Sequence, residues 1–199
     1  MLEYIPGSVT RILEIGCGNG KFGAAIRSSR NVYYVGVDLM PKAVEAAKKV
    51  LDVSLQADIE VDDLPFQHNS FDCLIMNDVL EHLRDPWGTL KKMMAYLAPG
   101  GYVVASLPNI RYYSVVKDLL INRQWRYAEN GVLDKTHIRF FTDKTIRDMF
   151  QGVNVEILTL NGINGTKFPW KFGLLNLLLA NALDDMRYMQ FALLGRKAL

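Results

Sequence analysis

The stretch LEIGCGNGKFG, Leu13 to Gly23, places four glycines among eleven residues, directly after the strand-like segment RILEI at 11–15. Because glycine lacks a side chain, such a loop lets backbone atoms touch a ligand directly. The glycines between Gly16 and Gly20 follow the pattern G-x-G-x-G, whereas a dinucleotide-binding fingerprint would need its third glycine at Lys21. The helix after the loop is therefore not expected to cradle a pyrophosphate, and the spacing argues against a nicotinamide-dependent dehydrogenase.

Strand-like and helix-like segments alternate along the rest of the chain. Further strands are expected at 32–38, 53–58, 71–77, 102–108, 153–160 and 187–195, and helices at 21–30, 41–51, 142–150, 172–183 and from Pro86 to the APGG turn at 98–101. This alternation predicts a mostly parallel sheet with helices on both faces. Ligands of such sheets bind outside the carboxyl ends of the strands, so the residues that follow each strand are the candidates for a site.

Acidic residues stand at three of these strand ends. Glu14 can receive a cationic amine, Asp38 lies where an acid takes both hydroxyls of a ribose, and Asp58 is within reach of the exocyclic amine of an adenine. Leu39 and Ile59 would flank the base. An ammonium, a ribose diol and an adenine without a phosphate describe S-adenosyl-L-methionine. This is the expected cofactor, with S-adenosyl-L-homocysteine as its product.

Five motifs carry a resemblance to a known family. In order they are ILEIGCGNG, VGVDLM, QADIE, LPFQHNSFDCLIMNDVLEHLRDP and LAPGGYVVASLPN, which together span roughly the first half of the chain. They resemble class I S-adenosylmethionine-dependent methyltransferases, in particular small bacterial enzymes of surface-polysaccharide clusters and the ubiquinone-pathway O-methyltransferases. The resemblance implies one α/β Rossmann-like domain over residues 1–199. Its sheet would have seven strands in the order 3-2-1-4-5-7-6, mostly parallel with the last strand antiparallel, and helices on both faces.

The resemblance also implies the cofactor contacts. Asp38 would hold the ribose, Asp58 and Ile59 the adenine, and Asn77 would lie along the methionine moiety, with backbone contacts from Gly16, Cys17, Gly18 and Gly20. Family members usually carry one or two helices before the first strand, which roof the site. Here only MLEYIPGSVT precedes that strand. We therefore expect either a roof from elsewhere, with 166–185 as a candidate lid helix, or a chain trimmed at its N-terminus.

The candidates for catalysis follow the fourth strand, in NDVLEHLRDP. If residues 78–83 are helical, Asp78, Glu81 and His82 fall on one face. His137, in LDKTHIRFF, precedes the helix expected at 142–150. Ubiquinone-pathway and small-RNA 2′-hydroxyl methyltransferases have a similar E-x-x-E-H and a later histidine, which hold a divalent metal. Here Asp78 replaces the first glutamate.

Three interpretations of these four residues stay open. The first is a structural cap or hydrogen-bonded network. The second is a general base, either His82 or His137, or a substrate-positioning pair. The third is a divalent-metal site formed by all four residues. We predict Asp78, Glu81, His82 and His137 as catalytic residues and assign no metal. His68 is expected to be solvent-exposed.

Residues 109–141 occupy the place of the acceptor-binding insertion in this superfamily. Their D-x-T-H-x-R-F-F-T pattern resembles methyltransferases of bacterial surface-polysaccharide genes, and side chains that could stack on a sugar or base, or pair with a phosphate, are Arg111, Tyr112, Tyr113, Trp125, Arg126 and Arg139. We expect methyl transfer to an oxygen of a glycan-like or quinone-like small molecule. The alternatives are a nucleic-acid 2′-hydroxyl methyltransferase and a non-catalytic S-adenosylmethionine-binding module.

Composition limits the partners and the location. The 199 residues carry a net charge of +2, so composition demands no acidic partner. Residues 109–150 carry 8 Lys and Arg against 5 Asp and Glu, an excess that is small for a nucleic-acid surface. Cys17 and Cys73 fit neither a disulfide framework nor a metal site. The apolar run at 172–183 is too short to span a membrane, and we expect a buried or lid-forming helix there, with a membrane-surface helix as the alternative. Glu3 and Pro6 interrupt any apolar run that could act as a signal peptide, and the two cysteines lie in apolar strand contexts, so a cytoplasmic location is expected. As a separate expectation, the protein is a monomer or a homodimer.

Overall fold

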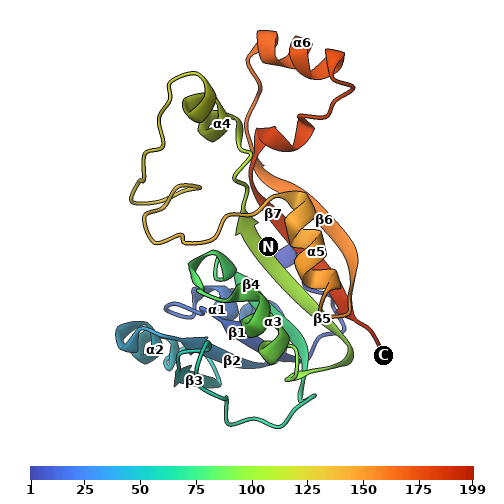
Figure 1. The fold of residues 1–199 in the computed structure, drawn as a ribbon. Helices are drawn as coiled ribbons and strands as arrows, with labels where there is room; N and C mark the ends of the chain where they lie inside the picture. Colours follow the sequence, from blue (N-terminus) through green and yellow to red (C-terminus); the bar gives the residue numbers. More distant parts are fainter.

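A seven-stranded sheet in the order β3-β2-β1-β4-β5-β7-β6 forms the centre of the molecule (Figure 1). The computed structural model describes residues 1–170 and 172–199 in full, and Lys171 only as a member of a helix. The strands are β1 Arg11–Ile15, β2 Tyr33–Asp38, β3 Val53–Gln56, β4 Phe71–Asn77, β5 Leu97–Pro108, β6 Val155–Gly165 and β7 Tyr188–Lys197. Strands β1 to β5 pair in parallel, and β7 is antiparallel to both β5 and β6. The expected order and the reversed last strand are confirmed.

Helices cover both faces of this sheet, as the alternation predicted. The helices that pack on it are α1 Lys21–Ser29, α2 Pro41–Ala47, α3 Pro86–Met93 and α5 Asp143–Gln151. The remaining helices are α4 Tyr113–Leu120 and α6 Trp170–Leu178, and short 3₁₀ helices lie at Leu2–Tyr4, Leu80–His82 and Asp184–Arg187. Because side chains alternate along a strand, β4 contributes side chains to two hydrophobic cores. Leu74 packs in the cluster that holds Leu90 of α3 and Ile146 of α5, whereas Cys73 packs in the cluster that holds Ile26 of α1.

Local signals explain where two helices begin. Asp85 caps α3 by accepting a hydrogen bond from the Gly88 amide, 3.0 Å away, and Pro86 takes the first helical position. A capping box between Thr142 and Thr145 starts α5. The end of α3 differs from the expectation, because the helix stops at Met93 and not at the APGG turn. Leu97 instead pairs with Phe71 and opens β5, where its side chain is fully buried.

The insertion at 109–141 leaves and rejoins the sheet at one point. A bridge pairs Asn109 with Phe141. The fully buried Asn109 also donates from its amide nitrogen to the carbonyls of Asp185 and Tyr188, at 2.9 and 3.0 Å. These bonds fix the base of the insertion against the start of β7. Helix α4, which the sequence did not predict, lies within the insertion.

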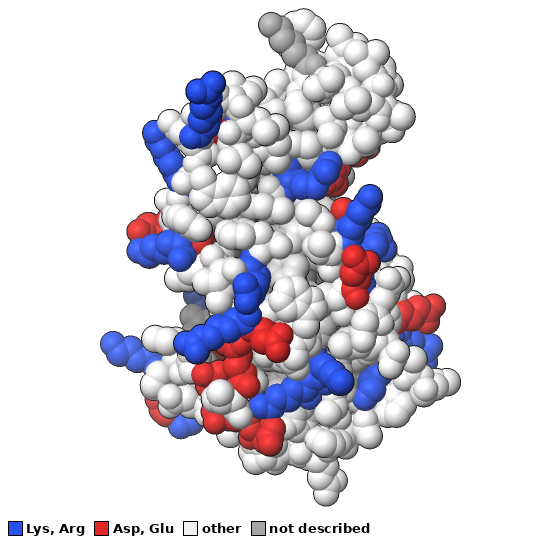
Figure 2. Space-filling model, viewed as in Figure 1, with Lys and Arg blue, Asp and Glu red and all other residues white. Residues whose placement is uncertain are grey.

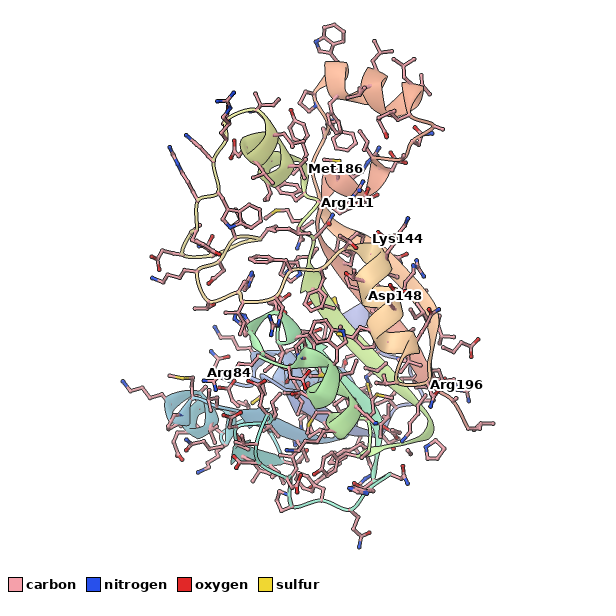
Figure 3. The ribbon with its side chains drawn as sticks, viewed as in Figure 1. Arg84, Arg111, Lys144, Asp148, Met186 and Arg196 are labelled. Atoms are coloured by element: carbon pink, nitrogen blue, oxygen red, sulfur yellow. The ribbon has the colours of Figure 1, made fainter. Side chains whose placement is uncertain are left out.

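Helices α4 and α6 stand beyond the end of the sheet (Figure 1). Their rings meet: Tyr113 lies 4.6 Å from Phe172, and Phe172 lies 4.6 Å from Phe168. Figure 3 shows Arg111 and Met186 where this part joins the sheet. The expectation of a buried helix at 172–183 is wrong, because α6 keeps Leu178 76% exposed. Its role as a lid stays a prediction. In the described part of the chain, no helix combines the length and apolar character needed to cross a bilayer.

Close packing of α1 against β2 makes Gly23 sensitive to substitution. A Cβ added there would lie 2.5 Å from Cδ2 of Leu51 and 2.7 Å from the ring of Tyr34, which is fully buried. We expect Gly23→Ala to lower the free energy of unfolding by about 1–3 kcal/mol, the usual range for overpacking. Gly173→Ala in α6 is the matched control, since nothing lies within 4 Å of a Cβ at that position. Urea denaturation measures both, and equal stability of the two variants would contradict the packing described.

Candidate active site

The glycine loop folds back onto the end of β2. Gly16 and Gly18 have positive φ angles of 70° and 53°, a region that L side chains rarely adopt. The amide of Gly16 donates to the carbonyl of Val37 at 2.8 Å, and the amide of Gly18 donates to Oδ2 of Asp38 at 2.8 Å. A Cβ at Gly16 would lie 2.6 Å from Val79. The loop therefore lies where the sequence placed it, at the carboxyl edge of the sheet.

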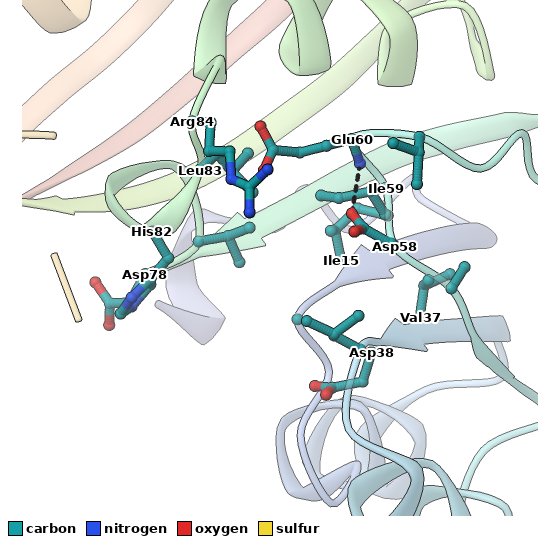
Figure 4. A pocket seen from close by; sticks show the side chains of 15 residues that line it. Ile15, Val37, Asp38, Asp58, Ile59, Glu60, Asp78, His82, Leu83 and Arg84 are labelled. Carbon is teal, nitrogen blue, oxygen red and sulfur yellow. Dashed lines mark hydrogen bonds between the residues drawn. The ribbon is translucent and has the colours of Figure 1, made fainter. Parts of the chain in front are cut away.

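A cavity of about 490 Å³ opens beside this loop. It gathers the side chains of Asp38, Leu39, Asp58 and Ile59, and the backbone of Gly16. Figure 4 shows Asp38 and Asp58 at one side of the cavity and Asp78 with His82 at the other. The residues expected at the ribose and adenine therefore line one pocket. We call it the nucleoside pocket.

A second hollow of about 490 Å³ continues from the nucleoside pocket along the other side of the loop. Its lining includes four of the five remaining expected cofactor residues, Glu14, Cys17, Gly18 and Asn77. Gly16 and Asp78 line both spaces, so the two form one groove. Gly20 does not line either space. With φ 78° it caps the start of α1, so it shapes the turn.

Glu14 has an unusual environment in this groove. It is 3% exposed, and its Oε2 accepts a hydrogen bond from the hydroxyl of Tyr34 at 2.8 Å. Burial raises the pKa of Glu14 to about 7, and the nearby charge of Asp38 adds to the rise, while the Tyr34 hydrogen bond opposes it. Tyr34 was not foreseen as the partner of Glu14, although it lies on the adjacent strand β2, four residues before Asp38.

Glu81 is a buried acid of the site whose carboxyl forms no hydrogen bond within the described residues. Its side chain is fully buried, and neither carboxyl oxygen has a hydrogen-bond partner within the described residues. Burial raises its pKa to about 8, helped by the charge of Asp78 and, to a lesser extent, of Asp134. A cavity of about 290 Å³, lined by Glu81, His82, His137 and Asp78, lies beside it. We call it the acceptor cavity.

Two histidines lie next to Glu81. The rings of His82 and His137 meet edge to face with centroids 4.8 Å apart, and Nε2 of the buried His137 lies 3.9 Å from Oε1 of Glu81. One potential ligand atom from each of Glu81, His82 and His137 lies within 4.8 Å of the others. Two imidazoles and a carboxylate are a donor set that suits a divalent transition metal as well as proton transfer.

Asp78 lines the same cavity but does not belong to the cluster of converging ligand atoms. The segment after β4 forms only a 3₁₀ helix at Leu80–His82, and Asp78 has a φ of 52°. The helix on which Asp78, Glu81 and His82 were expected to share a face is therefore not formed. Oδ1 of Asp78 instead accepts hydrogen bonds from Ser106 at 3.0 Å and Gln190 at 2.8 Å. Sequence reasoning missed both partners, although Ser106 comes from the carboxyl end of β5.

Some of the candidate acceptor-binding side chains are engaged in contacts within the fold, and others line a cavity. Arg111 pairs with Asp185 at 2.7 Å, and Nε of Arg139 donates to the carbonyl of Arg84 at 3.0 Å, so both hold the fold together. The rings of Tyr113 and Trp125 pack on neighbouring phenylalanines. By contrast, Tyr112 and Arg126 line a cavity of about 270 Å³, which shares Gly131, Val132 and Met189 with the acceptor cavity. His68 is exposed and lies outside these cavities, as expected.

The protein-family model and two related proteins that match this chain are all methyltransferases. Residues 2–160 match the model of a methyltransferase domain. An uncharacterized methyltransferase of Mycobacterium sp. (strain KMS) is 34% identical over 104 residues, which are 52% of this chain and 40% of that protein. A ubiquinone biosynthesis O-methyltransferase of Xanthomonas campestris pv. campestris (strain B100) is 33% identical over 117 residues, which are 54% of this chain and 48% of that protein. The chain thus matches less than half the length of these relatives.

Solved structures with the same fold include two S-adenosylmethionine-dependent methyltransferases. The protein from Mesorhizobium loti has a TM-score of 0.67 at 18% identity and covers 98% of this chain and 94% of its own. The protein from Archaeoglobus fulgidus has a TM-score of 0.67 at 15% identity, and the match covers 98% of this chain and 89% of that protein. At these identities the likeness establishes the fold.

The raised pKa of Glu14 predicts a pH dependence of ligand binding. We expect the amine of S-adenosylhomocysteine to bind beside Glu14, where an ionised carboxyl would attract it. Lowering the pH through about 7 would protonate the carboxyl and remove that attraction. We expect the Kd to rise up to about tenfold per pH unit below 7, the limit for one linked proton. Glu14→Gln should bind more weakly at pH 8 and show a flat profile. Calorimetry between pH 5.5 and 8.5 tests this, and a wild-type Kd that is constant over the range would contradict it.

Proposed function

The chain belongs to the methyltransferase domain family, whose cofactor is S-adenosylmethionine, and we propose that it methylates an oxygen of a glycan-like or quinone-like small molecule. Relatives named for O-methylation support the choice of oxygen. They are the Xanthomonas campestris protein described above and a 27-O-demethylrifamycin SV methyltransferase of Amycolatopsis mediterranei, 30% identical over 100 residues. Buried free thiols at Cys17 and Cys73 support a cytoplasmic location.

One observation carries this proposal: Asp78 and His82 line both the nucleoside pocket and the acceptor cavity. Methyl transfer requires the cofactor and the acceptor to meet in line, and bringing reactants to that geometry is the main source of acceleration. A boundary shared by two cavities is where such a meeting can occur. A binding module without catalysis would not need the second cavity, so this arrangement favours an enzyme.

The groove suits the proposed cofactor chemically. Asn77 has a buried amide oxygen without a hydrogen-bond partner within the described residues, and it lines the same hollow as Glu14. Both groups can accept from an ammonium, while Asp38 and Asp58 are acids placed for hydroxyls and an exocyclic amine. When bound there, S-adenosylmethionine supplies an electrophilic methyl carbon on a sulfonium sulfur.

The acceptor hydroxyl must lose a proton as its oxygen attacks. Because Glu81 has a pKa of about 8, its carboxyl carries a proton at neutral pH and leaves the imidazoles as the available bases. His82 lies at the boundary of the two cavities, so we assign proton acceptance to His82. His137 and Glu81 line the acceptor cavity behind it and can hold the acceptor. Asp78, held by Ser106 and Gln190, shapes the boundary.

A metal-assisted reaction is the second candidate, because Glu81, His82 and His137 offer three converging ligand atoms. A divalent cation there would favour the ionised form of Glu81 and would bind the acceptor oxygen directly. The nucleic-acid alternative has less support, since Arg111 and Arg139 are engaged within the fold and the net charge is only +2.

Single substitutions test the assignment of the base. We expect His82→Ala to lower kcat by about 10² to 10⁴, the usual contribution of a general base, while the Kd for S-adenosylhomocysteine stays within about threefold. Transfer of radiolabelled methyl groups to panels of quinols and glycans measures turnover. His68→Ala is the control, because this histidine lies outside the cavities.

Unchanged turnover in His82→Ala would refute the assignment. Loss of turnover on treatment with a chelator, with recovery on adding Mg²⁺ or Mn²⁺, would replace the base mechanism with the metal-assisted one.

A further inference from the structure

We propose that Thr136 and Asp134 are positioning residues that hold the neutral His82 ring in the tautomer with a hydrogen on Nδ1. Nε2 is then free to accept a proton. The inference deepens the proposed function, since it matters for catalysis only if His82 is the base. It is a statement about the imidazole itself, so it can be tested without turnover.

Hydrogen bonds around Nδ1 of His82 carry the argument. The Thr136 hydroxyl oxygen lies 3.1 Å from Nδ1, and the Thr136 carbonyl oxygen lies 3.3 Å from it. The same hydroxyl donates to Oδ1 of Asp134 at 2.6 Å. A hydroxyl has one hydrogen, so the Thr136 oxygen that gives its hydrogen to Asp134 can only accept at His82. The carbonyl also can only accept.

Both neighbours of Nδ1 are therefore acceptors, and the ring nitrogen must be the donor. In a neutral imidazole only one nitrogen carries a hydrogen, which leaves Nε2 with its lone pair. The orientation of the Thr136 hydroxyl decides this outcome. If the hydroxyl turned its hydrogen toward Nδ1, the opposite tautomer would be favoured and Nε2 could not accept a proton.

Asp134 keeps the hydroxyl in this orientation. Its Oδ1 also accepts from the Thr136 backbone amide at 2.8 Å, which fixes the carboxylate against the turn. Hydrogen bonds from the Thr136 hydroxyl and amide lower the pKa of Asp134, so it stays an ionised acceptor. His137 is held in the same tautomer more simply, since its Nδ1 lies 3.1 Å from the carbonyl of Val132. That bond comes from the backbone and cannot be removed by a side-chain change.

Nuclear magnetic resonance of the histidine ring nitrogens tests the relay directly. In protein labelled with ¹⁵N at histidine, with His82→Ala identifying the signals, the wild type should show neutral His82 protonated on Nδ1. Thr136→Val keeps the shape and the carbonyl but removes the hydroxyl, and should shift the population toward the Nε2-protonated form. Thr136→Ser, the conservative control, should keep the wild-type pattern. A wild-type His82 protonated on Nε2, or an unchanged pattern in Thr136→Val, would overturn the proposal.

Turnover gives the second readout. Thr136→Val should lower kcat about tenfold with KM and the Kd for S-adenosylhomocysteine unchanged, and Thr136→Ser should restore kcat. If His82→Ala leaves turnover untouched, the proposed function of His82 fails, while the nitrogen signals still decide whether the relay exists. A kcat for Thr136→Val equal to the wild type, with His82→Ala inactive, would overturn the relay.

A separate observation concerns the far end of the molecule. We infer that α4 and α6 form a docking surface for an anionic lipid membrane. Their exposed apolar side chains, which we call the apolar head, are Leu120, Ile121, Trp170, Leu174, Leu177 and Leu178. Figure 2 shows the white surface of this end with blue side chains beside it.

The apolar head is one continuous part of the molecule, in which leucines are exposed and a polar side chain is buried. The ring cluster of Tyr113, Phe168 and Phe172 joins α4 to α6. Asn176, in the middle of α6, turns inward, where it is 3% exposed and donates to Asp184 at 2.8 Å. The polar residue is thus buried while Leu177 and Leu178 are 65% and 76% exposed. This inverts the usual arrangement of a surface helix.

Charge selects a membrane over a second copy of the chain. Lys117, Arg123 and Lys167 lie close in sequence to the apolar head and form no ion pair within the described residues. The acids at its base are already paired, Asp184 with Arg187 and Asp185 with Arg111. The exposed Asp118 of α4 accepts a hydrogen bond from the Asn122 amide at 2.7 Å and offsets only one of the three positive charges. An apolar surface with a basic rim attracts anionic headgroups, whereas two such rims would repel each other.

Sedimentation with vesicles tests the docking surface. We expect binding to vesicles of equal parts phosphatidylglycerol and phosphatidylcholine, weaker binding at high salt, and little binding to phosphatidylcholine alone. A Leu177→Ser, Leu178→Ser double variant should lose at least tenfold in affinity and keep its Kd for S-adenosylhomocysteine. Leu158→Ser on β6, a leucine exposed elsewhere, is the control. No binding to the anionic vesicles, or a dimer by light scattering that the double variant abolishes, would overturn the inference.

Discussion

The hydrogen bond from the Gly18 amide to the Asp38 carboxylate is the contact on which the site depends. Strands β1 and β2 run in parallel with Ile15 level with Val37, so the chain after β1 must turn at once to avoid leaving the sheet edge. Left-handed glycines allow that turn. The bond then fixes the loop beside the acid that ends β2. Gly36 leaves room for it, since a Cβ there would lie 2.7 Å from the Cys17 sulfur. Backbone and carboxylate thus face one groove together.

Two buried carboxyls give the groove and the adjoining acceptor cavity their electrostatic character. Glu14 lies beside the glycine loop and Glu81 beside the acceptor cavity, with pKa values raised to about 7 and about 8 chiefly by burial. A neutral carboxyl is less costly to bury than an ionised one. Each group can change its charge near neutral pH when a ligand arrives. Glu14 would ionise toward an ammonium, while a neutral Glu81 leaves proton transfer to His82. In the proposed mechanism, the groove holds the ammonium at Glu14, and His82 deprotonates a hydroxyl held in the adjoining acceptor cavity.

The sequence predicted the parts that local patterns control. Apolar runs located the strands, Pro86 and Thr142 located two helix starts, and the rule of strand ends located Asp38 and Asp58. What it missed depends on contacts between distant residues. Pairing with Phe71 drew Leu97 into β5. Gln190 reaches Asp78 because β7 runs backwards, so the beginning of that strand, not its end, lies at the ligand edge. Thr136 meets His82 across 54 residues of chain, and no periodicity in the insertion signals that contact.

A crystal structure with S-adenosylhomocysteine is the most direct measurement of the central claim, that one groove binds a nucleoside at Asp38 and an amino acid at Glu14. The account predicts ribose hydroxyls on Asp38, the adenine between Leu39 and Ile59, and the amine next to Glu14 and Asn77. Its sulfur would then lie near the boundary formed by Asp78 and His82. Folded protein with an empty groove at saturating ligand, or density with the amino-acid tail in the nucleoside pocket, would contradict it.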